Sequence, residues 1–191
     1  MDRETQGISD AIELLESLYE MPVPRRAKCE TLFKLARRSK GRIVELGTWL
    51  GTGYIALCLG SDGRQPVWTV DDYSPKEGWA GEKYGPDDKE LYYFFCDKAN
   101  VRSNLLEMSF EQASSFFTGP IGLLFWDAGQ DKLLKTMKTW EPMIPSGGIM
   151  AIHDTYSNLF GAKDYIEPLI FLGMYRDYEV MPGGVHVAVK V

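Results

Sequence analysis

One acid and three closely spaced glycines are the residues best suited to bind a small ligand. Glu45 lies in a short apolar run, Gly47, Gly51 and Gly53 follow it, and the apolar segment after them reads as a helix. A strand, a glycine turn and a helix bring a ligand against bare backbone at a helix N-terminus. The spacing acid-x-Gly-x-x-x-Gly-x-Gly differs from the Gly-x-Gly-x-x-Gly of dinucleotide-binding proteins. It disfavours an NAD-binding oxidoreductase and suits a cofactor with a cationic amino-acid end.

Acids also follow three later apolar runs. They are Asp71 and Asp72 after 66–70, Asp127 after 121–126, and Asp154 after 149–152, where His153 precedes it. Ligands of open α/β sheets bind outside the carboxyl ends of the strands. We therefore expect Glu45, Asp71, Asp127 and Asp154 to converge on one rim, although acids at loop starts also serve simply as helix caps.

Alternating helical and strand patterns position these residues. Helices are expected at 10–20 (capped by Ser9), 25–38, 87–101, 131–140 and 163–172, a third short strand at 105–108, and a closing β-hairpin at 178–181 and 185–191. This alternation predicts an α/β fold with a mostly parallel sheet and right-handed crossovers. We expect one domain over 1–191, with N-terminal helices in 1–40 and a lid loop at 73–86, which is rich in glycine, proline and charge.

Composition limits the partners. The chain has 191 residues and a formal net charge of −6, which disfavours binding to duplex nucleic acid. It shows neither a signal-peptide pattern nor an apolar run of membrane-spanning length, so no membrane association is expected. Three scattered cysteines, Cys29, Cys58 and Cys96, suggest reduced thiols. We expect a cytoplasmic protein, with a homo-oligomer left open.

Four segments together resemble a known family. They are Val44-Glu45-Leu46-Gly47-Thr48, Val70-Asp71-Asp72, the run 123–127, and the run 147–155 with the sequence Gly-Gly-Ile-Met-Ala-Ile-His-Asp-Thr. The chain resembles the class I S-adenosylmethionine-dependent methyltransferases, nearest to small-molecule O-methyltransferases related to the catechol and macrolide-sugar enzymes. The resemblance runs from about residue 30 to the end. It implies a Rossmann-like, doubly wound, mostly parallel seven-stranded sheet with a C-terminal antiparallel hairpin.

The resemblance also implies a cofactor site for S-adenosylmethionine. Its residues would be Glu45, Gly47, Thr48, Trp49, Gly51, Gly53, Asp71, Asp72, Ser109, Phe110 and Asp127. Asp71 would accept hydrogen bonds from the ribose hydroxyls, a task that Asp72 could share. Ser109 and Phe110 would contact the adenine.

The same resemblance implies the reacting groups. Asp127 and Asp154 match two acids that hold a divalent cation, such as Mg²⁺, beside the acceptor oxygen in metal-dependent members. His153 and Asp127 are the catalytic candidates, although a histidine beside a buried strand more often makes a structural hydrogen bond. Two departures weaken the metal site and the general-base assignment: Gln130 stands where related enzymes carry a base, and Thr155 where catechol-type enzymes carry an asparagine ligand.

The predicted function is methyl transfer from S-adenosylmethionine to an oxygen of a small molecule, with a divalent metal as a possible assistant. Trp79 and Tyr84 are candidates for the acceptor pocket because they lie in a polar loop. A metal-independent methyltransferase, an enzyme that cleaves S-adenosylmethionine without an acceptor, and a non-catalytic cofactor-binding module remain as alternatives.

Overall fold

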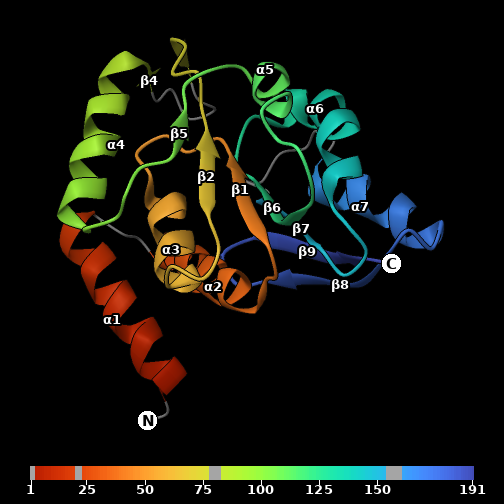
Figure 1. The fold of residues 1–191 in the computed structure, drawn as a ribbon, viewed down its shortest axis with the longest axis horizontal. Coiled ribbons are helices and arrows are strands. Elements are labelled where there is room, and N and C mark those ends of the chain that lie inside the picture. Colours follow the sequence, from red (N-terminus) through yellow and green to blue (C-terminus); the bar gives the residue numbers. More distant parts are fainter. Residues whose placement is uncertain (1–2, 20–22, 78–82, 154–160) are drawn as a thin grey trace.

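The computed structural model describes residues 3–19, 23–77, 83–153 and 161–191 (Figure 1). Seven strands form one sheet in the order β5-β2-β1-β6-β7-β9-β8. Their bounds are β1 Arg42–Leu46, β2 Val67–Val70, β5 Leu105–Leu106, β6 Ile121–Trp126, β7 Ile149–His153, β8 Tyr175–Met181 and β9 Val185–Lys190. The first five strands are parallel, and β9 pairs antiparallel with both β7 and β8. The predicted Rossmann-like, doubly wound α/β fold with a C-terminal hairpin is thus confirmed.

Helices cover both faces of the sheet. They are α1 Arg3–Leu18, α2 Val23–Arg38, α3 Thr52–Ser61, α4 Pro86–Lys98, α5 Phe110–Ser114, α6 Leu133–Trp140 and α7 Ala162–Phe171, with 3-10 turns at Gln130–Lys132 and Glu141–Met143. Helices α1 to α4 pack in one apolar core and α5 to α7 in the other. In Figure 1, α1 and α4 lie at the left of the sheet and α6 and α7 at the right.

The central strands are buried on both faces because helices cover each of them. Successive side chains of a strand point to opposite faces, and Ile43 accordingly joins one core while Val44 joins the other. Leu123 and Leu124 of β6 divide in the same way. This explains why these strands read as continuous apolar runs rather than as alternating patterns.

The strand register lines up the candidate site. Leu46 pairs with Val70 on one side and with Trp126 on the other, and Trp126 pairs in turn with Ile152. The residues that follow these four are Gly47, Asp71, Asp127 and His153. They therefore stand in a row along the carboxyl edge of the sheet. Asp71 and Asp127, two of the four acids predicted to converge there, belong to this row, whereas Glu45 lies within β1 and Asp154 lies outside the described residues.

Three local expectations need correction. The first helix begins at Arg3 rather than at residue 10, so Ser9 lies inside α1 and its hydroxyl donates to Glu13 instead of capping the helix. The short helix α5 was not predicted. The expected lid loop contains a small antiparallel pair, β3 Lys76–Glu77 with β4 Lys83–Tyr84.

Candidate functional site

The turn after β1 is built around glycines that no other residue could replace without strain. Gly47 and Gly51 have φ angles of 92° and 87°, in the left-handed region. A Cβ on Gly47 would lie 2.5 Å from the carbonyl oxygen of Asp127, and one on Gly51 would lie 2.7 Å from the ring of Tyr92. Gly51 is also the N-cap of α3, and no side chain caps this helix start. The first-turn N–H groups of α3 are therefore available to an anionic group of a ligand.

The Asp71 carboxylate, which is 5% exposed, holds this turn in place. Its Oδ2 accepts the backbone N–H groups of Thr48 at 3.0 Å and Trp49 at 3.2 Å, and its Oδ1 accepts that of Tyr73 at 3.1 Å. A carboxylate offers about four acceptor positions. Three of them serve the backbone here, which leaves capacity for one further donor.

Glu45 lies beneath the turn rather than on its surface. Its side chain is 1% exposed, and Oε2 accepts the Thr69 hydroxyl at 2.7 Å. Its Oε1 lies where a Cβ on Gly53 would have to go, so the third glycine of the motif makes room for this acid. Burial raises the pKa of Glu45 to about 8. The carboxyl is thus mostly neutral at pH 7, and it supports the turn from inside.

Asp127 joins two side chains from distant parts of the chain. Its Oδ2 accepts the ammonium of Lys28, on α2, at 2.7 Å, and its Oδ1 lies 2.8 Å from Nδ1 of His153, at the end of β7. The side chains of Lys28 and His153 are 14% and 15% exposed. Burial opposes ionisation of Asp127, but the Lys28 ammonium and the His153 imidazole hold its pKa well below the usual range. An ionised carboxylate only accepts hydrogen bonds, so His153 carries its hydrogen on Nδ1 and Nε2 is its basic nitrogen.

The predicted magnesium site does not fit this arrangement. Mg²⁺ needs carboxylate oxygens at about 2.0–2.1 Å, and both oxygens of Asp127 are engaged by Lys28 and His153. Within the described ranges, no group of three or more histidine, cysteine, aspartate and glutamate side chains is arranged to hold a metal. The second predicted ligand, Asp154, lies outside the described residues, as does Thr155.

Sequence reasoning missed Lys28. It lies among several basic residues of the second helix, and 99 positions separate it from its partner Asp127. No local spacing identifies it, because only the packing of α2 against the sheet brings the two side chains together. His153 and Asp127, the predicted catalytic pair, do meet.

An aromatic cluster borders the turn. The rings of Trp49 and Tyr84 meet edge to face with centroids 5.2 Å apart, and the Arg25 guanidinium lies 5.8 Å from the centroid of Trp49. The Tyr73 hydroxyl donates to the carbonyl of Trp49 at 2.8 Å. The indole Nε1 of Trp49 is buried and has no hydrogen-bond partner among the described residues. This donor is suited to an acceptor atom of a ligand.

The remaining predicted cofactor residues lie near the same edge with clear local roles. Ser109 is the N-cap of α5, and its hydroxyl accepts the backbone N–H of Gln112 at 3.2 Å. Phe110 packs edge to face against Trp126 with centroids 5.3 Å apart. Asp72 is partly exposed and accepts the Ser74 N–H at 3.0 Å. Although burial opposes it, this backbone hydrogen bond helps to hold the pKa of Asp72 below its usual range.

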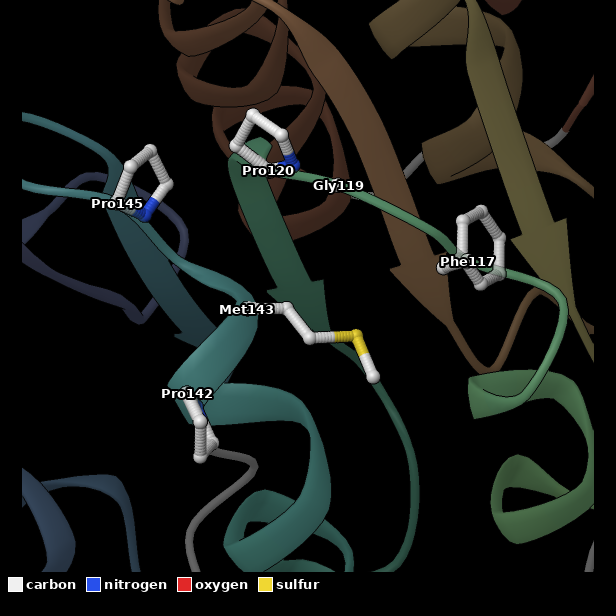
Figure 2. Close-up of a pocket in the computed structure, with 6 residues that line it drawn as sticks. All are labelled: Phe117, Gly119, Pro120, Pro142, Met143 and Pro145. Atoms are coloured by element: carbon white, nitrogen blue, oxygen red, sulfur yellow. The ribbon is translucent and has the colours of Figure 1, made fainter.

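A surface pocket of about 330 Å³ lies elsewhere (Figure 2). Its lining residues are Phe117, Gly119, Pro120, Pro142, Met143 and Pro145. Gly119 and Pro120 precede β6, whereas Asp127 follows it. The pocket therefore opens at the amino edge of the sheet and belongs to a different part of the molecule from the glycine turn.

With this geometry in place, comparison with known proteins identifies the family. The family model of a methyltransferase domain matches residues 44–155, more than half of the chain. The chain therefore belongs to the methyltransferase domain family. This match confirms the predicted membership of the class I S-adenosylmethionine-dependent methyltransferases. A search of curated proteins finds no match.

Solved structures share the fold at low sequence identity. The O-methyltransferase NovP is 14% identical with a TM-score of 0.74, covering 98% of this chain and 99% of its own. The S-adenosylhomocysteine-bound methyltransferase PaMTH1 of Podospora anserina is 18% identical with a TM-score of 0.65, covering 97% and 88%. An rRNA methylase from Streptococcus thermophilus is 12% identical with a TM-score of 0.59, covering 84% and 95%. The fold thus occurs with more than one class of acceptor.

In the part of the chain that the structure describes, no helix is both long and apolar enough to cross a bilayer.

Proposed function

We propose that this protein transfers a methyl group from S-adenosylmethionine to an oxygen of a small molecule. The family match supports methyl transfer as the reaction class. The observation that carries the proposal is the row formed by the glycine turn, Asp71, Asp127 and His153 along one edge of the sheet. It combines a backbone cradle for the cofactor with an acid–imidazole pair beside it.

The cofactor would lie across the glycine turn. The uncapped start of α3 suits the carboxylate of the methionine portion. The remaining acceptor capacity of Asp71 suits a ribose hydroxyl. The partly exposed Asp72 would accept from a second one. Ser109 and Phe110 lie at the start of α5, where they would contact the adenine. The binding of S-adenosylhomocysteine by PaMTH1, which has the same fold, supports this cofactor.

The reacting groups would meet above Asp127. S-adenosylmethionine supplies a methyl group activated by its positively charged sulfur. His153 Nε2 would take the proton of the acceptor hydroxyl, while Asp127 holds the ring through Nδ1 at 2.8 Å. Transfer by direct displacement requires the two reactants to be aligned, so much of the rate would come from positioning them.

Acceptor choice would depend on the aromatic cluster beside the turn. Trp49 and Tyr84 offer an apolar surface, and Arg25 lies next to it. The segments 73–77 and 83–86, together with the N-terminal helices, would form the wall that closes over a bound acceptor. These surroundings favour a hydroxylated aromatic molecule over an aliphatic one.

An acceptor screen tests the proposal. The purified protein is incubated with methyl-labelled S-adenosylmethionine and a panel of phenols, catechols and sugar derivatives, and the products are identified by mass spectrometry. Label in an O-methyl product that disappears in the His153→Gln variant is the expected result. Cofactor consumption without a methylated acceptor would instead identify a cleaving enzyme, and tight cofactor binding without any turnover would identify a binding module.

A further inference from the structure

We propose that the ammonium of Lys28 holds the acceptor oxygen at the position where metal-dependent methyltransferases hold a divalent cation. Methyl transfer by this chain would then require no metal. The inference rests on the proposed function and adds two statements to it: a role for Lys28 and the independence of the reaction from metal. It is carried by the ion pair between Lys28 and Asp127 and by the way the fold fixes α2 at that point.

The ion pair lies beside the catalytic imidazole. Lys28 Nζ and His153 Nδ1 approach different oxygens of the same Asp127 carboxylate, at 2.7 and 2.8 Å. An ammonium group has three hydrogens to donate, and the contact with Asp127 uses one of them. The Lys28 side chain is 14% exposed, so the surrounding protein does not enclose it completely.

The closing hairpin anchors the helix at Lys28. A Cβ on Gly183, between β8 and β9, would collide with the backbone nitrogen of Lys28, so the hairpin tip lies directly against α2. One turn further along, the Thr31 hydroxyl donates to the carbonyl of Pro182 at 2.8 Å. Lys28 is thus held on a helix backbone that the hairpin tip contacts at two successive points, which favours a fixed position over a mobile surface lysine.

The same contact disfavours a metal. A cation on Asp127 would have to displace the ammonium or lie next to it, and two positive charges a few ångströms apart repel each other strongly in a partly buried site. Lys28 also neutralises the negative charge that would attract the ion. The side chain that excludes the metal would supply the positive charge that the metal supplies in other enzymes.

The proposed reaction balances without a further reactant. The acceptor oxygen forms a bond to the methyl carbon as the carbon–sulfur bond breaks, and the electrons of that bond neutralise the sulfonium. The acceptor proton passes to His153, while hydrogen bonds from Lys28 stabilise the negative charge that develops on the acceptor oxygen. The products are the methyl ether, S-adenosylhomocysteine and one proton.

Manganese binding, followed by electron paramagnetic resonance, tests the exclusion without any acceptor. The wild-type protein should show no saturable Mn²⁺ site, whereas Lys28→Met should gain one, with an affinity at least about tenfold above the non-saturable binding of the wild type. Lys28→Arg keeps the charge and should resemble the wild type, as should Lys34→Met, which removes an exposed lysine from the same helix. Adding Asp127→Asn to Lys28→Met should abolish the new site. A wild-type Mn²⁺ site that Asp127→Asn removes, or no gain in Lys28→Met, would overturn the proposal.

Methyl-transfer assays provide a second test once an acceptor is known. Methyl transfer by the wild type should survive exhaustive chelation, and Lys28→Met should lower kcat and then respond to added Mg²⁺. Activity that chelation abolishes and Mg²⁺ restores in the wild type would contradict the role of Lys28. S-adenosylhomocysteine binding, measured on the same preparations, reports on the proposed function separately, because failure there would leave the Mn²⁺ results unchanged.

Discussion

Asp71 accepts the backbone N–H of Trp49 at 3.2 Å and so ties the end of the second strand to the glycine turn after the first. The same oxygen also accepts the N–H of Thr48 at 3.0 Å. The acid expected to bind the ribose therefore also shapes the backbone on which the cofactor would lie. Asp71 would thus serve both the architecture of the turn and the proposed binding of the cofactor.

Replacing Asp71 by alanine should weaken S-adenosylhomocysteine binding by about a hundredfold or more, because it removes charged hydrogen-bond partners from the turn as well as from the ligand. Asp72→Ala is the neighbouring control, and it should weaken binding much less because Asp72 contacts no part of the turn after β1 in the described hydrogen bonds. Calorimetric titration of both variants measures the difference. If Asp71→Ala and the wild type bound S-adenosylhomocysteine with equal affinity, Asp71 would not belong to the cofactor site.

Replacing Gly53 by alanine should destabilise the fold by about 1–3 kcal/mol, since the new methyl group would collide with the buried carboxyl of Glu45. Gly85→Ala is a matched control, because a Cβ there meets nothing within 4 Å and its φ of 177° is open to any residue. Urea denaturation gives both free energies of unfolding. If the two variants lost the same stability, the tight packing of Gly53 on Glu45 could not be the cause.

The buried acid beneath the turn should make stability depend on pH. The pKa of Glu45 rises from 4.5 to about 8 on folding, so the folded state binds more protons than the unfolded chain between these values. The contribution of Glu45 to stability is complete below pH 4.5 and is lost as the pH rises through about 8. Glu45→Gln, which keeps the shape of the protonated acid, should match the wild type near pH 5 and exceed its stability near pH 9. Urea denaturation at both pH values measures the two free energies of unfolding. A difference in stability between Glu45→Gln and the wild type that is the same at pH 5 and pH 9 would contradict the raised pKa of Glu45.

Replacing Asp127 by asparagine should lower kcat by about a hundredfold or more, because an amide can donate to His153 Nδ1 and stabilise the wrong tautomer of the base. Affinity for S-adenosylhomocysteine should change much less, since the turn and Asp71 remain intact. Steady-state kinetics with an identified acceptor, combined with calorimetry, separates the two effects. A variant with unchanged kcat would show that the Asp127–His153 pair does not take part in the chemistry.

The sequence predicted the architecture where local patterns decide it. Continuous apolar runs identified the buried strands, and the acids after them identified the carboxyl edge of the sheet, where we propose the site. The N-cap of α5 was also readable, because Ser109 and Gln112 form the Ser-x-x-Gln pattern of a capping box. The contact of Ser109 with the adenine, which the resemblance implies, is compatible with this cap and stays a prediction.

What the sequence could not provide were contacts between distant residues. Lys28 and Asp127 meet only through the packing of α2. Glu45 was expected at the cofactor, but in the structure its side chain points inward, beneath Gly53. The Lys28–Asp127 contact and the orientation of Glu45 both depend on the direction in which a side chain points after the helices have packed. Lys28 forms an ion pair with Asp127, one of the two acids from which the metal site was predicted, and no sequence pattern indicates this contact.

The most direct test of the central claim is a calorimetric titration of the unmodified protein with S-adenosylhomocysteine, performed in the presence of a chelator. The account predicts saturable one-to-one binding that needs no metal and that Asp71→Ala weakens. A folded protein that gives no binding heat and no ligand-induced rise in melting temperature would contradict the assignment of the glycine turn as a cofactor site, and with it the proposed methyl transfer.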